Sequence, residues 1–146
     1  MRAHEFVEQL DHDRILKSIA AAEVKSSGQI RIFVHRGQLK DDALAHAQTQ
    51  FIKLGMRKTK ARNGVLIFVA PRARQFAVVG DEGVHAKCGE AFWQQLVDKM
   101  RAHFQSENFT GAIVHAISET GDLLAAHFPR QTDDLDELPN EIVEGD

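Results

Sequence analysis

The sequence has 146 residues, of which 43% are hydrophobic and 27% are charged. This length is typical of a single domain, and this composition excludes a fibrous or wholly disordered chain. The formal net charge of −3 is unevenly placed, because residues 131–146 hold seven acidic residues and no lysine or arginine. We therefore expect one folded domain over residues 1–130, followed by an acidic C-terminal tail over residues 131–146 that either extends into solvent or docks back on the domain.

The amino-terminal segment and the apolar runs argue against export and membrane insertion. Residues 1–14 carry charges every few positions and contain no apolar core of a signal peptide. The longest apolar run, residues 64–70, is much shorter than the roughly 20 residues needed to cross a bilayer. With one cysteine, Cys88, the chain has no internal disulfide, which fits a reducing compartment. These features predict a cytoplasmic protein without a transmembrane segment, in which Cys88 is a packing residue.

The first predicted elements are a helix and a strand. Asp11 or Asp13 is the expected N-cap of a helix that ends at residues 26–28. In residues 29–36 the side chains alternate, so that one face of a strand is apolar and faces the core; its residues are Ile30, Ile32 and Val34.

The next segments predict a second helix and two more strands. Asp41 is the expected N-cap of a helix with an apolar stripe made of Leu44, Ala47, Phe51 and Leu54. Residues 64–70 are apolar on both faces, as in a central strand between two layers of helix. Strand, helix and strand in one sheet imply a parallel pair with a right-handed crossover. A short turn then leads to a strand over residues 75–79, which we expect to return antiparallel.

Two long helices are predicted after residue 85, from apolar residues at helical spacing over residues 92–104 and 113–128. Strands that alternate with helices, together with the returning hairpin strand, define the expected fold class. The sequence thus predicts an α/β fold: a three-layer α/β/α sandwich with a small mixed sheet of three to four strands.

The predicted strand directions bring three polar segments to one edge of the sheet. Parallel strands begin at the same edge, and an antiparallel third strand ends there. Carboxylate and amide oxygens are the ligands that Ca²⁺ and Mg²⁺ prefer. We therefore hypothesise a divalent-metal site made of Asp81, Glu82, Glu23 and Asn63, with Arg62 and His85 beside it as anion-binding residues. The alternative is that these polar residues only close turns and cap the next helix.

A basic run lies next to these acids: Arg57, Lys58, Lys60 and Arg62. It either binds phosphate or is a solvated loop whose charge the acidic tail neutralises. Nucleic-acid binding is disfavoured, because the net charge is negative and no aromatic residue interrupts the run.

The opposite edge of the sheet offers a rival site. Open α/β sheets usually bind ligands outside the carboxyl ends of their parallel strands. Four residues are expected there: His35, Arg36, Arg72 and Arg74. No phosphate-binding glycine pattern and no complete catalytic set is present, so the sequence predicts no organic cofactor and leaves catalytic residues unassigned.

The order and spacing of several segments resemble the TPM domain family, in a bacterial stand-alone form, over roughly residues 10–128. These segments are Ser27-Gly-Gln-Ile-Arg31, Asn63-Gly-Val-Leu-Ile-Phe-Val-Ala70, Phe76-Ala-Val-Val-Gly80 and the paired amphipathic helices. The resemblance implies an α/β/α sandwich with a small mixed sheet. The family is named in part for a thylakoid-lumen protein proposed to be an acid phosphatase, other members look like accessory modules in membrane-complex maintenance, such as photosystem II repair, and divalent-metal binding has been suggested for some.

Three functions are consistent with the residues and the resemblance. The first is an accessory or interaction module with an unknown protein partner and a Ca²⁺ or Mg²⁺ site. The second is a weak metal-dependent phosphatase, in which the acidic residues and Asn63 hold the ion while Arg62 and His85 position a phosphate. The third is anion or nucleic-acid binding through the basic loop, which added salt would weaken.

Overall fold

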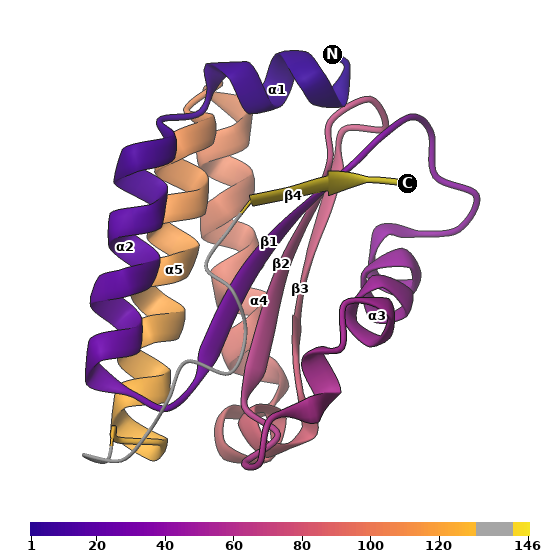
Figure 1. The fold of residues 1–146 in the computed structure, drawn as a ribbon. Coiled ribbons are helices and arrows are strands. Elements are labelled where there is room, and N and C mark those ends of the chain that lie inside the picture. The colour runs from indigo at the N-terminus through magenta and orange to yellow at the C-terminus, as the bar shows by residue number, and fades with distance from the viewer. Residues whose placement is uncertain (131–141) are drawn as a thin grey trace.

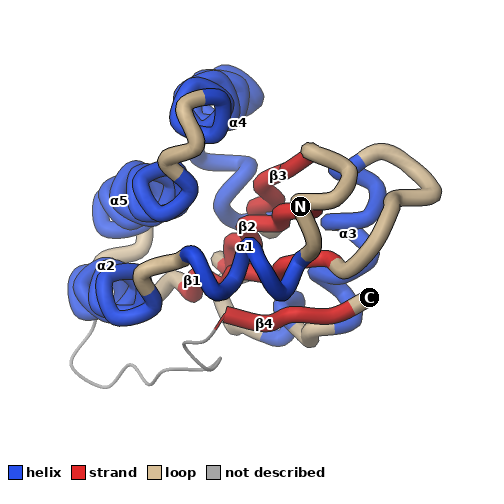
Figure 2. Tube along the Cα trace, turned by 90° about the horizontal axis from the view of Figure 1, so that it is seen from above, coloured by secondary structure: helices blue, strands red, loops and turns tan. Residues whose placement is uncertain are grey.

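The computed structural model describes residues 1–130 and 142–146 (Figure 1). Its helices are α1 (Ala3–Gln9), α2 (His12–Lys25), α3 (Ala43–Lys53), α4 (Glu82–Gln105) and α5 (Phe109–His127), with a short 3-10 helix, η1 (Met56–Lys58). Its strands are β1 (Gln29–His35), β2 (Gly64–Ala70), β3 (Gln75–Gly80) and β4 (Ile142–Gly145). Helices α2, α4 and α5 cover one face of the sheet and α3 covers the other, while α1 lies across one end (Figures 1 and 2). The predicted α/β class with helices on both faces of a small mixed sheet is confirmed.

The sheet has the order β3-β2-β1-β4. Strands β1 and β2 are parallel, with Gln29 opposite Gly64, whereas β2 and β3 are antiparallel, with Val65 opposite Gly80. Both predicted strand directions are therefore confirmed, so the starts of β1 and β2 and the end of β3 share one edge of the sheet.

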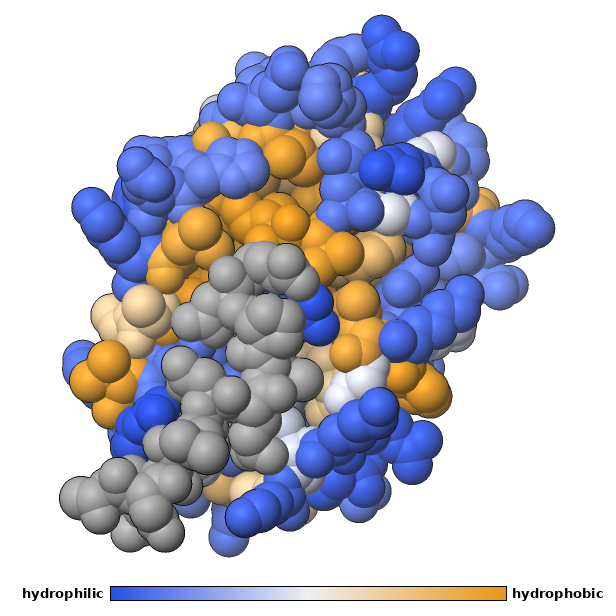
Figure 3. Space-filling view, in the orientation of Figure 1, coloured by the Kyte–Doolittle hydropathy of each residue, from blue (hydrophilic) through white to orange (hydrophobic). Residues whose placement is uncertain are grey.

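The fourth strand comes from the predicted tail. Residues Ile142–Gly145 pair in parallel with Ile32–His35, and the Gln50 Nε2 atom donates to the Asp146 carbonyl oxygen at 2.7 Å. Apolar side chains gather beside this strand within a hydrophilic surround (Figure 3). Docking, one of the two expectations for the tail, thus holds for residues 142–145. The rest of the tail, residues 131–141, lies outside the described residues, and the boundary at residue 130 stays a prediction.

Two separate apolar clusters sandwich the sheet. Alternate residues of β1 and β2, among them Ile32 and Ile67, pack against α1, α2, α4 and α5, while Leu66 and Phe68 pack against α3 and η1. Phe33 and Phe68 stack with ring centroids 5.9 Å apart on the α3 side. Burial of β2 on both faces is what its unbroken apolar sequence predicts.

The helix starts follow their capping residues. Of the two expected caps of α2, Asp11 is the N-cap, since its Oδ1 atom accepts from the Arg14 amide at 3.1 Å. The prediction of Asp41 as the cap of α3 is wrong by one residue. Asp42 is the cap, with its Oδ1 atom 2.7 Å from the Ala45 amide, whereas the Asp41 amide donates to His46 Nε2. The shift points Ala43 into the core and leaves Leu44 50% exposed.

Helix α4 begins earlier than the sequence suggested and is broken in the middle. It starts at Glu82 rather than after His85, with Asp81 as its N-cap. Gly89 has φ 72° and ψ 178°, a backbone region that is essentially restricted to glycine. The chain up to Cys88 is therefore one short helix, set at an angle to the longer helix that follows.

Replacing Gly89 with alanine is expected to lower the free energy of unfolding by about 1–3 kcal/mol, the cost of holding another residue in this conformation. An added Cβ would meet nothing within 4 Å, so the penalty is conformational and not a clash. Urea denaturation measures it, and an unchanged unfolding midpoint would show that the break is not required.

Cys88 packs against the larger core cluster, as predicted for a packing residue. Burial raises the pKa of its thiol, which lowers the thiolate fraction near neutral pH. We expect a disulfide reagent such as dithionitrobenzoate to react more slowly with Cys88 in the folded protein at pH 8 than in the urea-unfolded chain. Equal rates in the two states would contradict this account.

Within residues 1–130 and 142–146, each helix is too short or too polar to traverse a lipid bilayer.

Candidate functional site at the amino edge of the sheet

The predicted convergence of loops occurs at the edge where β1 and β2 begin. The Gln29 amide donates to the Asn63 carbonyl oxygen at 3.3 Å, and the Asp81 amide donates to the Gly64 carbonyl oxygen at 2.9 Å. The first bond joins the loop before β2 to the start of β1, and the second joins the start of β2 to the residue that follows β3. We call this region the amino edge.

Gly83 allows the first turn of α4 to lie directly against this loop. Its amide donates to the Arg62 carbonyl oxygen at 3.0 Å. A Cβ at this position would lie 2.6 Å from that oxygen and would also overlap the Ala61 carbonyl oxygen. Only glycine therefore permits the backbone approach that brings Asp81 and Glu82 to Arg62.

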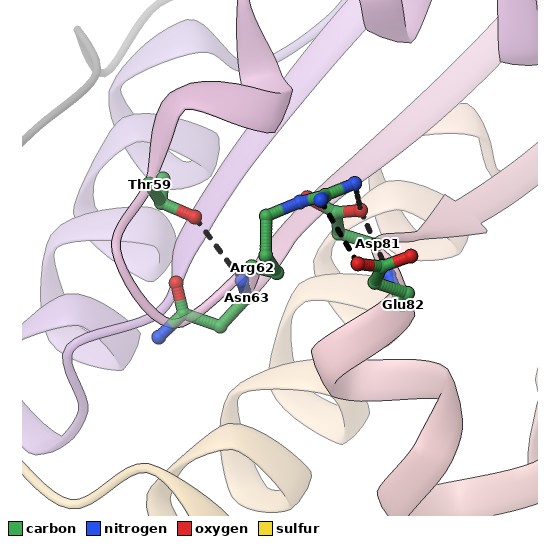
Figure 4. Close-up of polar contacts among 5 residues, drawn as sticks. All are labelled: Thr59, Arg62, Asn63, Asp81 and Glu82. Atoms are coloured by element: carbon green, nitrogen blue, oxygen red, sulfur yellow. Dashed lines mark hydrogen bonds and ion pairs between the residues drawn. The ribbon is translucent and has the colours of Figure 1, made fainter.

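Arg62 bridges the two carboxylates (Figure 4). Its Nε and Nη2 atoms donate to the two oxygens of Asp81, each at 2.8 Å, and its Nη1 atom donates to Glu82 Oε1 at 2.9 Å. The bidentate geometry is the strong form of an arginine–carboxylate pair. The hydrogen bond to Asp81, with the nearby charges, raises the pKa of the Arg62 guanidinium against the opposing effect of burial.

The two carboxylates differ in burial and in role. The Asp81 side chain is only 5% exposed, and its Oδ1 atom also accepts from the Glu82 amide at 2.8 Å. The Glu82 side chain is 73% exposed. Asp81 therefore anchors both the helix start and Arg62, while Glu82 presents its carboxylate to solvent.

Asn63 points away from this pair (Figure 4). Its Nδ2 atom donates to Ser27 Oγ at 3.1 Å, and its amide donates to Thr59 Oγ1 at 3.1 Å. Its Oδ1 atom is buried and accepts no hydrogen bond from any residue that the structure describes. The structure thus places Asn63 at the amino edge, but on the opposite side of the loop from Asp81.

The two remaining predicted residues have other surroundings. Glu23 is buried on α2, and its carbonyl oxygen accepts from Arg130 Nη1 at 2.7 Å. The Nδ1 atom of His85 accepts from the Trp93 indole nitrogen at 3.1 Å. Among the described residues, no group of three histidine, cysteine, aspartate or glutamate side chains is arranged to hold a metal ion. The metal site of Asp81, Glu82, Glu23 and Asn63 stays a prediction, as does anion binding by Arg62 and His85.

Two residues that organise the edge were not predicted from the sequence. Thr59 is buried and holds the Asn63 amide, and Trp93 holds His85 across the break at Gly89. Helical spacing gave no signal for the contact of His85 with Trp93, because the helix is broken at Gly89 between them. Thr59 had no signal either, because it lies among the exposed basic residues Arg57, Lys58 and Lys60.

The chain is a small α/β sandwich domain, with an open mixed sheet between two helical layers and charged loops at the amino edge. The chain belongs to the TPM domain family, whose model matches residues 3–123. The resemblance found in the sequence is thereby confirmed.

Solved structures share the same fold. The BA42 protein from the psychrophilic bacterium Bizionia argentinensis is 35% identical, with 92% of each chain covered and a TM-score of 0.84. The N-terminal domain of the cg2496 protein from Corynebacterium glutamicum is 14% identical and has a TM-score of 0.58. The match covers 90% of this chain and 76% of the cg2496 domain. At this identity it shows the fold alone. No curated protein sequence matches this chain.

Proposed function

We propose that this TPM domain is an accessory binding module in which a divalent cation competes with Arg62 for Asp81 and Glu82. The observation that carries the proposal is the single guanidinium bridging both carboxylates, at 2.8 to 2.9 Å. Two carboxylates held together favour a positive charge between them. Arg62 supplies that charge here, and Ca²⁺ or Mg²⁺, which bind carboxylate oxygens, are the natural competitors.

The exposure of these side chains gives a cation access to the pair. Glu82 is largely exposed and Arg62 is 30% exposed, whereas Asp81 is buried. An incoming ion meets Glu82 first, and Arg62 can move aside by side-chain rotation. Asp81 is fixed by the Glu82 amide and supplies the rigid ligand.

The same geometry argues against the phosphatase hypothesis. That hypothesis assigned the Arg62 guanidinium to a substrate phosphate. Three of its five N–H donors are instead held by Asp81 and Glu82. Two donors remain, and the whole guanidinium becomes available for a phosphate when the two carboxylates have another partner, so cation binding would favour any phosphoryl chemistry at Arg62.

Separate titrations with Ca²⁺, Mg²⁺ and Mn²⁺ test the proposal, read by amide chemical shifts and by thermal melting. We expect shifts at residues 62, 81 and 82, and a cation at 100 times its dissociation constant adds about 2.7 kcal/mol of stability. The double variant Asp81→Asn, Glu82→Gln should lose the response. Glu90→Gln removes an 89% exposed carboxylate just beyond the break in α4 and should retain it.

Two results would overturn the proposal. One is a wild-type protein whose amide shifts and melting temperature do not respond to any of the three ions. The other is hydrolysis of p-nitrophenyl phosphate that rises with the cation and disappears in Asp81→Asn, which would favour the phosphatase.

A further inference from the structure

A cavity of about 480 Å³ opens at the other end of the sheet, between α1, the β2–β3 turn and the carboxyl end of α4. Figure 2 shows α1 lying across this end of the sheet. The volume is in the range of about 300–1,000 Å³ that small-molecule sites occupy. Four phenylalanines contribute to its wall: Phe6, Phe76, Phe104 and Phe109.

The aromatic rings form one connected cluster with open surface. The Phe76 and Phe104 centroids are 4.8 Å apart, and Phe109 lies 6.2 Å from Phe104. These three rings are only half-buried, so part of each faces the cavity. Such a wall favours an aromatic or alkyl group over water.

Two arginines stand beside this wall. The Arg101 guanidinium carbon lies 5.9 Å from the centre of the Phe76 ring, and its Nη1 atom pairs with Asp98 at 3.1 Å. Arg74 is exposed at the β2–β3 turn and forms no ion pair with any residue in the described part of the chain. Arg74 therefore offers a guanidinium without a carboxylate partner to the mouth of an apolar cavity.

The backbone fixes two residues of the cavity mouth. Arg74 and Glu107 have φ values of 55° and 60°, in the left-handed region. Each closes a tight turn, since the Arg74 amide donates to the Pro71 carbonyl oxygen at 3.1 Å and the Glu107 amide to the Phe104 carbonyl oxygen at 3.0 Å. The cavity also adjoins the carboxyl end of β2, the edge at which open α/β sheets usually bind ligands.

Of the four residues that the sequence predicted for a rival site at this edge, only Arg74 lines the cavity. His35 is buried, and its Nε2 atom contacts the Gln38 carbonyl oxygen at 3.2 Å, while Arg36 pairs with Glu144 at 3.4 Å. Arg74 lines the cavity, and its neighbour Arg72 is not among the lining residues. Only one of the two turn arginines is thus placed to bind a ligand in the cavity.

We propose that this cavity binds a small organic carboxylate with an aromatic or alkyl body. The carboxylate pairs with Arg74 and Arg101, because a guanidinium matches its planar geometry, and the body packs on Phe76 and Phe104. Neither a cation nor Arg62 takes part, so the inference does not depend on the proposed function of the amino edge.

The test compares 4-phenylbutyrate with its neutral analogue 4-phenylbutanol and with butyrate, each followed by chemical shifts of the intact protein. We expect 4-phenylbutyrate to shift resonances of Phe76, Phe104 and Arg74 with the highest affinity of the three. Arg74→Gln should weaken it about tenfold, since a charge-assisted hydrogen bond contributes about that factor. Arg72→Gln, which removes the same charge from the same turn, should leave the affinity unchanged.

Three results would overturn the inference. The first is that millimolar 4-phenylbutyrate shifts no resonance of the cavity, the second that 4-phenylbutanol binds as tightly, and the third that Arg72→Gln weakens binding as much as Arg74→Gln. The last two would assign the binding to apolar contact alone or to overall charge. The amide spectrum of each variant shows whether it is folded, so a misfolded variant is recognised before its affinity is compared.

Discussion

Replacing Gly83 with alanine is expected to destabilise the fold by about 3 kcal/mol or more, at the upper end of the cost of overpacking. The added Cβ would lie 2.6 Å from the Arg62 carbonyl oxygen, which is backbone and cannot turn aside as a side chain can. Either α4 or the loop before β2 must move. Both movements lengthen the Gly83–Arg62 hydrogen bond and pull Asp81 away from Arg62.

Urea denaturation of Gly83→Ala measures this cost, with Lys87→Ala as the matched control. Lys87 is exposed on the same helical segment, so its replacement should change the free energy of unfolding by at most about 0.5 kcal/mol. If the two variants unfold at the same urea concentration, the close approach of α4 to the loop is not a requirement of the fold.

Asp81→Ala is the second change with a large expected effect. It removes the N-cap of α4, which alone is worth about 0.5–2 kcal/mol. It also takes away the partner of two Arg62 hydrogen bonds, so the total loss should exceed that of a cap. The melting temperature and the urea midpoint should both fall.

Glu82→Ala is the comparison for this prediction. Glu82 contacts the same guanidinium, but its side chain is 73% exposed, and exposed ion pairs contribute little to stability. We expect a much smaller change in melting temperature than for Asp81→Ala. Equal losses in the two variants would mean that Asp81 does not hold the amino edge together.

The architecture was predictable because its signals lie within short stretches of sequence. Alternation in Ile30, Ile32 and Val34 marks the face of β1 that meets the larger core, and the apolar run of β2 marks a strand buried on both sides. Strand directions followed from the connections between them, and those directions placed Arg62 near Asp81. The proximity of these two residues at one edge of the sheet was thus accessible from the sequence, whereas their ion pair was not.

Side-chain direction in the loop was not accessible from the sequence. Arg62 has φ 53°, and no motif in the basic run predicts this conformation. With this backbone conformation the Arg62 side chain faces Asp81, while the Asn63 side chain faces Ser27. The break at Gly89 was not predictable either, because the sequence does not show whether a glycine within a helical pattern has a helical or a positive φ. The aromatic cavity was missed because its wall combines α1, β3, α4 and α5, which no local pattern connects.

The most direct test of the central claim is the affinity of Arg62→Gln for Ca²⁺ and Mg²⁺, compared with wild type and with Arg57→Gln. Arg57 lies in the same basic loop, so its replacement removes an equal charge without freeing Asp81 or Glu82. If Arg62 and the cation compete, Arg62→Gln should bind the ion several-fold more tightly than both other proteins. Affinity that is unchanged or lower in Arg62→Gln, or raised equally in Arg57→Gln, would contradict the competition.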